Sequence, residues 1–487
     1  MPSKQISRAS LERKNADLEK ENHYLKGILI ALSREATGKK SERFIPAPGI
    51  CLFRDEIELP EPLPSLPKEE KREKKKPKRK KIPAHFKRKV IRIDPTFDTS
   101  KMVHIGDEVT EKLEYTPASF SVIQYRRGKF KDAQGKIHIA ELKDPFPKSI
   151  AAASLASTLL VRKYEDHLPI TRQIRIMKRE GMEMAKSTAL NITKVALEHL
   201  RPVHNALLNK ILSQDYIQVD ETSIGVVDKQ EHQVKNRCML VMLAVQAKLV
   251  AFQFTGTKTK QMIWNAIQGF EGHLQTDGNV SYEHAELLEN VDLLNCHAHA
   301  RRKLENLEKQ GDKEAAKALV LYQKLYMLER KAKELGLHDD GLRDFRLKYS
   351  IPVLDQLKAF LEKHRTDHDP ADPFNKAARY ILKRWNRLTK FVEQGRFHPD
   401  TNMLERQIRD LVIGRKNYLF CLNDKSAERT GIIYSLSRTA RLHGIPFNTW
   451  LCEYFIRIID HPINRIHELL PTQDFEFIHY PDPRVPL

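Results

Sequence analysis

Cysteine is scarce in this sequence, and its few copies do not form metal-binding pairs. There are 5 cysteines among 487 residues, and none of them stands in a C-x-x-C pair. This spacing argues against a zinc ribbon and against a disulfide framework, and it suits a protein of a reducing cytoplasm. We therefore expect neither a zinc site nor disulfide bonds.

Long apolar runs are also missing. The longest one, residues 150–161, has only 12 residues and is rich in Ala and Ser. A helix that spans a membrane needs about 20 apolar residues, so an integral membrane protein is excluded. The opening sequence MPSKQISRASLERK has no apolar segment of the kind found in secretory signals. We expect a cytoplasmic protein without a membrane partner.

Acidic residues are too few to balance the basic ones. Asp and Glu total 64 against 84 Lys and Arg, which gives a net charge of +20. The hydrophobic types make up 40% of the chain, enough for sizeable cores, so a wholly disordered chain is excluded. The length suggests about three domains, and the charge favours nucleic acid as the partner.

The first 35 residues carry a heptad pattern. Leucines recur at every seventh position from Leu11 to Leu32, and Asn15 and Asn22 fall at the facing a positions. Asparagine at a positions favours parallel dimers with a fixed register. We expect a coiled coil over residues 1–35 that joins two chains, although one amphipathic helix packed on its own protein would show the same pattern.

A basic and proline-rich linker is expected over residues 36–92. Residues 68–92 contain 14 Lys and Arg but only 3 Glu, a density that resists folding and attracts phosphate. Pro77 and Pro83 interrupt this run, which also follows the leucine heptad at a distance, unlike the continuous basic helix of a basic-zipper factor. A solvated tail is the alternative. The residues expected to bind DNA are Lys39, Lys40, Lys75, Lys76, Lys78, Arg79, Lys80 and Lys81.

The middle of the chain changes from strand to helix character. Residues 93–148 alternate and are rich in β-formers, which predicts a small module of short antiparallel strands. Residues 149–212 predict helices over 150–164, 169–180 and 187–200. Gly181 separates the last two, and Ser187 or Thr188 is the expected N-cap. The pattern is typical of a helix-turn-helix-like DNA-binding region, but a purely structural helix pair would look the same.

Residues 213–302 predict a mixed core. Three β-rich runs are followed by a helix, a fourth strand, a fifth strand and another helix, which is the order of a ribonuclease H-like core. Asp220 lies inside the first run, where a carboxylate costs several kcal/mol unless it is paired or binds metal. Asp277 ends the fourth strand, where a turn role is the ordinary alternative. Glu221 is a rival to Asp220 but is expected on the opposite side of the strand.

The last part of the chain predicts mostly helix. Residues 303–395 read as a helical insertion, and residues 396–445 as the second part of the core. We expect a helix that bears Glu405, is capped by Asp400 or Thr401 and ends at Gly414. A helical tail is expected over residues 446–487. The overall expectation is a multidomain α+β protein.

Several motifs together resemble one protein family. They are GKKSERF (38–44), LLVRKYEDHLPITRQIRIMKREG (159–181), YIQVDET, LQTDGNVSY, CHAHARRK (296–303), and the long segments 378–420 and 426–445. The chain resembles the large transposase of the bacterial IS-sixty-six (insertion sequence sixty-six) family over nearly its whole length. The segment 106–130 resembles the family's zinc module, but no cysteine lies between residues 93 and 150, so we expect no zinc there.

The resemblance implies a function and its residues. It implies a DDE transposase whose catalytic and metal-binding residues are Asp220, Asp277 and Glu405, spaced by 57 and then 128 residues. Three such carboxylates would hold two Mg²⁺ or Mn²⁺ ions. The implied partners are double-stranded DNA, both the terminal inverted repeats of the element and the target, with a homodimer or larger assembly and small accessory proteins of the same element. Location at the bacterial nucleoid follows.

Other charged residues surround these motifs. Four basic residues close to Glu405 are expected to clamp phosphates, unless they form only a solvated helix face: Arg406, Arg409, Arg415 and Lys416. His299 and Arg302 are expected near the active site or the DNA, since the Cys296 cluster lacks a fourth zinc ligand. The alternative functions are a DNA-binding regulator without enzymatic activity and an inactive transposase relic.

Overall fold

The computed structural model describes most of the chain from residue 120 onward. It covers residues 120–127, 129–131, 137–139, 141–228, 230–283, 290–367, 369 and 371–480. The expected coiled coil, the basic linker with the eight lysines and arginines expected to bind DNA, and much of the expected β module lie outside these residues. Within the module, β1 (Lys129–Lys131) pairs with β2 (Ile137–Ile139) in antiparallel fashion.

Four helices follow this hairpin. They are α2 (Ala153–Tyr164), α3 (Ile170–Arg179), α4 (Lys186–His199) and α5 (Arg201–Leu212). The first three confirm the helices expected from the sequence, with Gly181 at φ +87° in the turn between α3 and α4. The expected N-cap was wrong, because α4 begins one residue earlier and Ala185 takes the cap position without a side-chain hydrogen bond. Ser187 and Thr188 lie inside the first turn.

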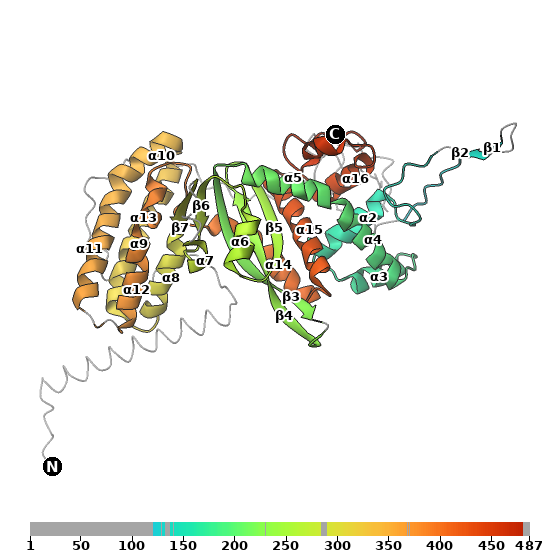
Figure 1. The fold of residues 1–487 in the computed structure, drawn as a ribbon. Coiled ribbons are helices and arrows are strands. Elements are labelled where there is room, and N and C mark those ends of the chain that lie inside the picture. The colour runs from blue at the N-terminus through green and yellow to red at the C-terminus, as the bar shows by residue number, and fades with distance from the viewer. Residues whose placement is uncertain are drawn as a thin grey trace, which may run out of the picture.

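A five-stranded mixed sheet forms the centre of the molecule (Figure 1). Its strands stand in the order β5-β4-β3-β6-β7, antiparallel among β3, β4 and β5 and parallel from β3 to β6 and β7. They are β3 (Tyr216–Asp228), β4 (Gln233–Ala244), β5 (Leu249–Gly256), β6 (Gly272–Thr276) and β7 (Val291–Asn295). Two short helices, α6 (Lys260–Ala266) and α7 (Val280–Glu283), lie between them in sequence. The five strands expected from the sequence are thus confirmed.

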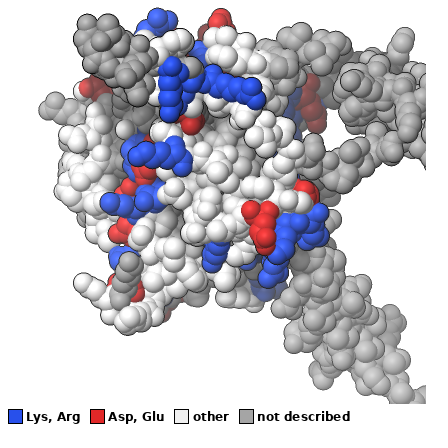
Figure 2. All heavy atoms as spheres, turned by 90° about the vertical axis from the view of Figure 1, so that its right-hand side faces the viewer, with Lys and Arg blue, Asp and Glu red and all other residues white. Residues whose placement is uncertain are grey.

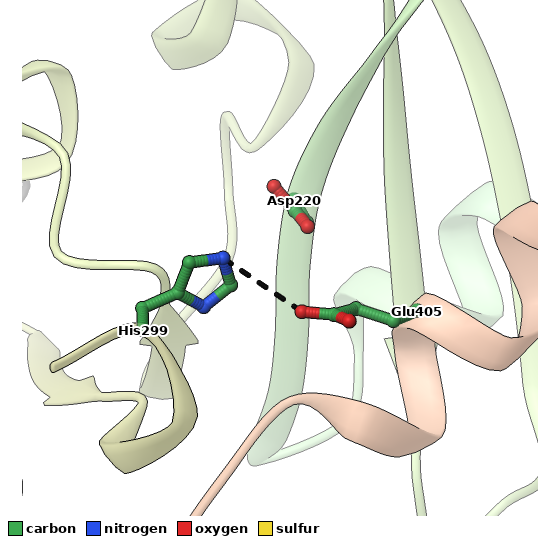
Figure 3. A group of neighbouring side chains, drawn as sticks. All are labelled: Asp220, His299 and Glu405. Atoms are coloured by element: carbon green, nitrogen blue, oxygen red, sulfur yellow. Dashed lines mark ion pairs between the residues drawn. The ribbon is translucent and has the colours of Figure 1, made fainter. Parts of the chain in front are cut away.

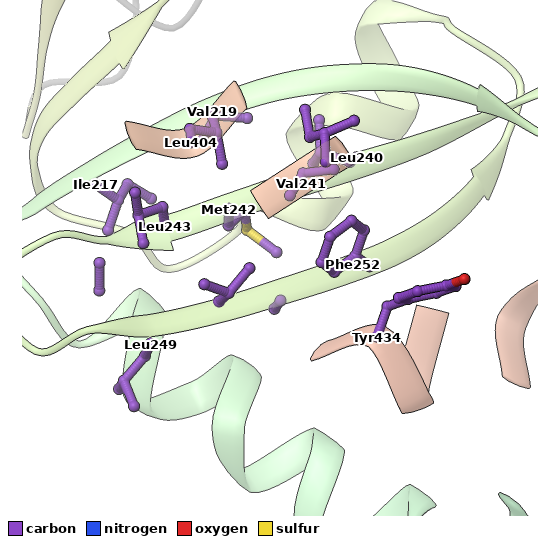
Figure 4. Close-up of a cluster of buried hydrophobic side chains, with 14 of the residues drawn as sticks. Ile217, Val219, Leu240, Val241, Met242, Leu243, Leu249, Phe252, Leu404 and Tyr434 are labelled. Carbon is purple, nitrogen blue, oxygen red and sulfur yellow. The ribbon is translucent and has the colours of Figure 1, made fainter. Parts of the chain in front are cut away.

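Figure 4 shows a cluster of buried hydrophobic side chains in the sheet and in the helices packed on it. Ile217 and Val219 of β3 are fully buried there, as are the β4 residues 240–242. The helices α14 (Asn402–Tyr418) and α15 (Asp424–Leu442) supply Leu404 and Tyr434 to the same core. Burying such side chains contributes about 1.5–3 kcal/mol each. This packing fixes the helix that bears Glu405 against the central strand.

Helix α14 is longer than expected, because Gly414 does not end it. The helix continues to Tyr418, and Leu419 with φ +66° follows it. Gly414 is buried, and a Cβ atom there would lie 2.3 Å from the Tyr434 hydroxyl oxygen. The glycine therefore allows α14 and α15 to approach closely, and the prediction of a helix end was wrong.

Helix α15 covers the edge of the sheet at β5. The Ser435 hydroxyl accepts a hydrogen bond from the Phe252 N–H at 2.7 Å, and the Thr439 hydroxyl accepts one from Val250 at 3.0 Å. Gly431 lies so close that a Cβ there would be 2.6 Å from the Phe252 carbonyl oxygen. These contacts satisfy donors that an open edge strand would leave exposed.

Residues between β7 and α14 are almost wholly helical, as expected, and form the bundle to the left of the sheet in Figure 1. The elements are α8 (His297–Glu308), α9 (Lys313–Glu334), α10 (Asp339–Phe345), the π-helix η3 (Arg346–Ser350), α11 (Ile351–Asp367), α12 (Pro373–Lys383), α13 (Trp385–Thr389) and the 3-10 helix η4 (Lys390–Val392). Buried Arg346 ties the bundle together, because it pairs with Glu329 and donates to the Phe397 carbonyl.

The C-terminal part returns to the first helices. Helix α16 (Phe447–Arg457) packs on α2 and is followed by the 3-10 helix η5 (Ile463–Leu469). Glu453 of α16 is fully buried, and its carboxylate accepts hydrogen bonds from the backbone N–H groups of residues 478–480. Within the described residues no helix has the length and apolar character needed to cross a membrane.

Candidate active site

Asp220 lies in the middle of β3, the central strand, opposite Val241 of β4. Its Oδ1 accepts a hydrogen bond from the Glu221 N–H at 2.8 Å. Burial, and then the negative charge of Asp277, raise the pKa of Asp220 to about 7. A half-buried carboxyl group with so strong a shift in its pKa is a frequent mark of a functional site.

Asp277 follows β6 directly and lies level with Asp220. Since β3 and β6 are parallel and Gln218 pairs with Gln275, both aspartates come two residues later, toward the same end of the sheet. Gly278 has φ +82°, and its carbonyl accepts a hydrogen bond at 3.0 Å from the side chain of Arg384, which follows α12. The bundle therefore holds the turn that carries Asp277.

Glu221 lies beside these aspartates, contrary to expectation. One carboxylate oxygen of Glu221 lies within 4.8 Å of oxygens of Asp220 and Asp277. Glu221 Oε2 also lies 3.0 Å from Lys258 Nζ. Strand alternation fixes the direction of Cβ only. A glutamate carboxylate is two bonds further out and can turn back toward its neighbour, so the prediction that Glu221 lies apart was wrong.

Glu405 lies in the first turn of α14, and a buried polar network holds the segment that precedes this helix. Gln218 of β3 donates to the Asp400 carbonyl at 3.0 Å, and Gln275 of β6 donates to the His398 carbonyl at 2.7 Å. The network thus anchors the segment before α14 to the two strands that carry the aspartates. Asp400 accepts from the Asn402 N–H at 3.1 Å, which satisfies one donor at the start of the helix.

Helix α8 is fastened to the same segment. Its first backbone N–H, from His297, donates to the Pro399 carbonyl at 2.9 Å, and the Thr401 hydroxyl lies 3.3 Å from the Cys296 sulfur. His297 itself is fully buried between Tyr322 and Phe391, and burial lowers its pKa to about 4. His297 is therefore a core residue of the bundle.

His299 reaches the site from the first turn of α8. Its Nε2 lies 3.7 Å from Glu405 Oε1, and both side chains point toward Asp220 (Figure 3). Arg302, one turn further along α8, lies 3.8 Å from the same glutamate oxygen. His299 and Arg302, which were expected near the active site or the DNA, thus both lie next to Glu405.

The described residues contain two groups of side chains suited to a cation, and the groups share Asp220. One group is Asp220, Glu221 and Asp277, and the other is Asp220, His299 and Glu405. In each group the ligand atoms lie within 4.8 Å of one another. Ligands of one Mg²⁺ at about 2.1 Å stand at most about 4.2 Å apart, so small side-chain rotations suffice and the donors fit a divalent ion.

Comparison with known proteins agrees with this geometry. The profile described as "Transposase IS66 family" matches residues 148–429, more than half of the chain. The chain belongs to this family. Membership of a transposase family implies DNA binding, strand cleavage or transfer, and the use of divalent metal.

Three relatives from Sinorhizobium fredii (strain NBRC 101917 / NGR234) are similar over most of their length. "Uncharacterized protein y4hP" is 27% identical over 438 residues, which cover 82% of this chain and 77% of the relative. "Uncharacterized protein y4jD" is 28% identical, covering 80% and 81%, and "Uncharacterized protein y4qI" is 25% identical, covering 81% and 77%. The likeness extends beyond the profile match.

A cavity of about 290 Å³ opens over the acidic residues of this transposase-family chain. Its lining combines the second ligand group and two members of the first, without Asp277, with two arginines and one apolar residue: Asp220, Glu221, His299, Arg302, Glu405, Ile408 and Arg409. Arg409 lies one helical turn after Glu405, as the sequence suggested. The cavity therefore places positive side chains next to the carboxylates, where a bound phosphate would meet them.

The other basic residues expected near Glu405 differ in their surroundings. Arg406 and Lys416 are exposed on α14. Arg415 is half-buried, and its guanidinium donates to the Thr222 hydroxyl at 3.1 Å and to the backbone of Ser223 in β3. Burial lowers the pKa of Arg415. Arg415 thus holds the end of α14 to the central strand.

A basic surface that the sequence reasoning did not single out lies on α3. Four of the ten residues of this helix are basic and exposed: Arg172, Arg175, Lys178 and Arg179. Figure 2 shows the face that carries α2 to α4 and α16, where Lys and Arg side chains outnumber Asp and Glu. The spacing of three and four residues is the signal that could have revealed this helix face.

Proposed function

We propose that this chain is a DNA transposase that cuts the ends of its element and joins them to target DNA by two-metal phosphoryl transfer. Asp220, Asp277 and Glu405 are its catalytic carboxylates. The observation that carries this proposal is the double membership of Asp220, which belongs to one ligand group with Asp277 and to another with Glu405. A carboxylate shared by the two groups would help to hold two divalent ions close together, which is the arrangement that two-metal phosphoryl transfer uses.

The sheet supports a ribonuclease H-like core. Three antiparallel strands continue into two parallel strands, and the acids come from the central strand, its parallel neighbour and a helix packed on the same sheet. In this interpretation residues 213–302 and 396–445 make up the core, and residues 303–395 interrupt it as a helical insertion. The bundle then positions Asp277 through Arg384 and is part of the catalytic architecture.

The side chains of the cavity have two proposed roles: the carboxylates bind metal and the arginines bind phosphate. Two Mg²⁺ or Mn²⁺ ions held by the carboxylates would activate the attacking oxygen and stabilise the leaving 3′ oxygen. Arg302 and Arg409 line the same cavity and hold the phosphate between these positions by charge-assisted hydrogen bonds. The protein supplies no covalent nucleophile, so one site serves both cutting and joining.

Double-stranded DNA is the proposed partner, and its path extends beyond the cavity. The basic face of α3, the exposed residues Arg406 and Lys416, and the basic linker each offer sites for phosphate contacts. The chain is proposed to act as a homodimer or larger assembly, because two DNA ends must be held together during joining. Small accessory proteins of the same element are further proposed partners.

A DNA-binding regulator is the alternative of a different class. A regulator has no need for carboxylates from β3, β6 and α14 to converge. Within each of the two groups the ligand atoms lie within 4.8 Å of one another, and this convergence favours the enzyme. An inactive relic would keep the same geometry, so only an activity assay distinguishes it.

The test replaces each acid by its amide. Glu405→Gln keeps the shape of the side chain but removes the charge that binds metal. We expect Mg²⁺-dependent 3′-end cleavage of DNA bearing the element's termini to fall by orders of magnitude, with DNA binding and thermal stability close to wild type. Asp220→Asn and Asp277→Asn should behave alike, and the double variants should lose little more.

The matched control is Glu393→Gln, which changes an exposed glutamate directly after η4. Cleavage by this variant should equal that of the wild type. Cleavage by Glu405→Gln at the wild-type rate would refute the assignment of the third acid. An inactive wild-type protein that still binds the termini would identify a relic.

A further inference from the structure

We propose that His299 is a metal ligand, so that the two metal positions of this chain differ in chemistry. The inference rests on the proposed function and deepens it. The position made by Asp220, Glu221 and Asp277 offers oxygen atoms only. The position made by Asp220, Glu405 and His299 offers two carboxylates and one imidazole nitrogen.

The placement of His299 is built into the fold. The start of α8 is bonded to the segment before α14 through the His297 N–H and the Cys296 sulfur, at 2.9 Å and 3.3 Å. These two contacts set the first turns of α8 and α14 side by side. His299 and Glu405 therefore face each other across the cavity, with side chains only 18% and 16% exposed.

The two positions also differ in charge. The oxygen position combines three carboxylates with the ammonium group of Lys258, which contacts Glu221 at 3.0 Å. The mixed position combines two carboxylates, one of them shared, with the neighbouring guanidinium groups of Arg302 and Arg409. Fewer negative charges and more positive neighbours weaken the mixed position for any hard cation.

The type of ligand atom also indicates that the mixed position binds Mg²⁺ less tightly than the oxygen position. Mg²⁺ strongly prefers oxygen ligands, while imidazole suits transition metals. Mn²⁺ combines an affinity for carboxylates with the tolerance for nitrogen of a first-row transition metal. We infer that Mn²⁺ fills both positions and that Mg²⁺ fills the mixed position less readily.

A competing explanation is an ion pair without metal. A protonated His299 at 3.7 Å from Glu405 would simply neutralise that carboxylate. The two explanations differ in one observable. A ligand nitrogen couples magnetically to a bound Mn²⁺ ion, whereas the nitrogen of a protonated imidazolium does not coordinate it.

The experiment measures Mn²⁺ binding to the full chain and the nitrogen signal of the bound ion. Wild type should bind two Mn²⁺ ions and show nitrogen modulation in electron spin-echo spectra. His299→Ala should bind one ion tightly and lose the modulation. Asp277→Asn should also lose one ion but keep the modulation, because it removes the oxygen position. If the alanine variant folds poorly, His299→Gln replaces it, because glutamine preserves side-chain bulk. This variant should likewise bind one ion tightly and lose the modulation.

The control is His338→Ala, which removes an exposed histidine in front of α10 and should leave both readings unchanged. Two bound ions without any nitrogen modulation in the wild type would overturn the inference and leave the proposed function standing. Equal Mn²⁺ binding by wild type and Asp220→Asn would overturn both this inference and the proposed function, since Asp220 is common to the two metal positions.

Discussion

Asp220, a proposed catalytic residue, illustrates how burial shifts the pKa of a carboxyl group in the absence of a bound cation. Its pKa of about 7 in the folded protein exceeds the ordinary value of 3.8 because of burial and of the neighbouring Asp277. The folded state therefore binds the proton more tightly than the unfolded state. The resulting stability is complete below about pH 3.8 and is lost as the pH rises through about 7.

Because the raised pKa of Asp220 makes stability fall as the pH rises, the metal-free protein should respond to a substitution at this position. Asp220→Asn should raise the free energy of unfolding in chelator at pH 8 by an amount on the order of 2 kcal/mol, with a corresponding rise in melting temperature, and should change both little near pH 4. Added Mg²⁺ should stabilise the wild type and not the variant. Differential scanning fluorimetry across pH 4–8 measures both effects. Identical pH profiles for the two proteins would contradict the assigned cause.

At the same scale, the sequence predicts some site residues better than others. Asp220 could be singled out from its place in an apolar strand, whereas Glu405 was assigned through the family resemblance, and the helix pattern alone predicted only that it lies on a helix. Glu221 was misplaced because strand alternation fixes Cβ and not a distant carboxylate. The pairing of His299 with Glu405 depends on contacts between α8 and α14, which no local pattern encodes.

Among the elements, α14 illustrates how a glycine can mislead. Glycine favours helix ends, yet Gly414 lies within this helix and faces Tyr434 of α15. The local pattern gave the start of the helix correctly. Its end depends on the close approach of a second helix, which lies outside the information in any short window of sequence.

Gly414→Ala should therefore destabilise the protein, although alanine is favoured over glycine in helices by about 1 kcal/mol. The added Cβ would meet the Tyr434 hydroxyl at 2.3 Å and Tyr418 Cε1 at 2.9 Å, and such overpacking costs about 1–3 kcal/mol. Thermal midpoints measure the loss, which should shrink in a Tyr434→Phe background.

Gly341→Ala in α10 is the matched control for this change. A Cβ there would meet only Leu337 Cδ2 at 3.9 Å. The control should be neutral or slightly stabilising. Equal effects of the two substitutions would show that helix propensity, and not contact with α15, decides the outcome at Gly414.

For the whole molecule, the excess of positive charge predicts how binding responds to salt. Residues 68–92 carry up to 14 basic groups. If six of them contact phosphate, the log–log slope of affinity against salt should be about −5. Replacing residues 68–92 by a Gly/Ser segment of equal length should flatten the slope, as measured by fluorescence anisotropy on any duplex. An unchanged slope would assign the effect to other surfaces.

The order of elements along the chain was predictable, but their assembly was not. Alternation and helical spacing predicted β3 to β7 and the helices that follow α8. The cover of β5 by Ser435 and Thr439, and the return of α16 to α2, join segments that are far apart in sequence. Such contacts follow from the shape of surfaces and leave no short-range pattern.

The late arrival of α14 and α15 has a consequence for synthesis. At about 5–20 residues per second, a ribosome completes these helices roughly ten seconds or more after β3 to β5 have emerged. During this interval the apolar side of the strands, with Phe252, lacks its cover, and the edge of β5 lacks α15. Nascent chains at this stage are suited to chaperone binding and to aggregation. Premature termination there releases an unshielded sheet that carries Asp220 without Glu405.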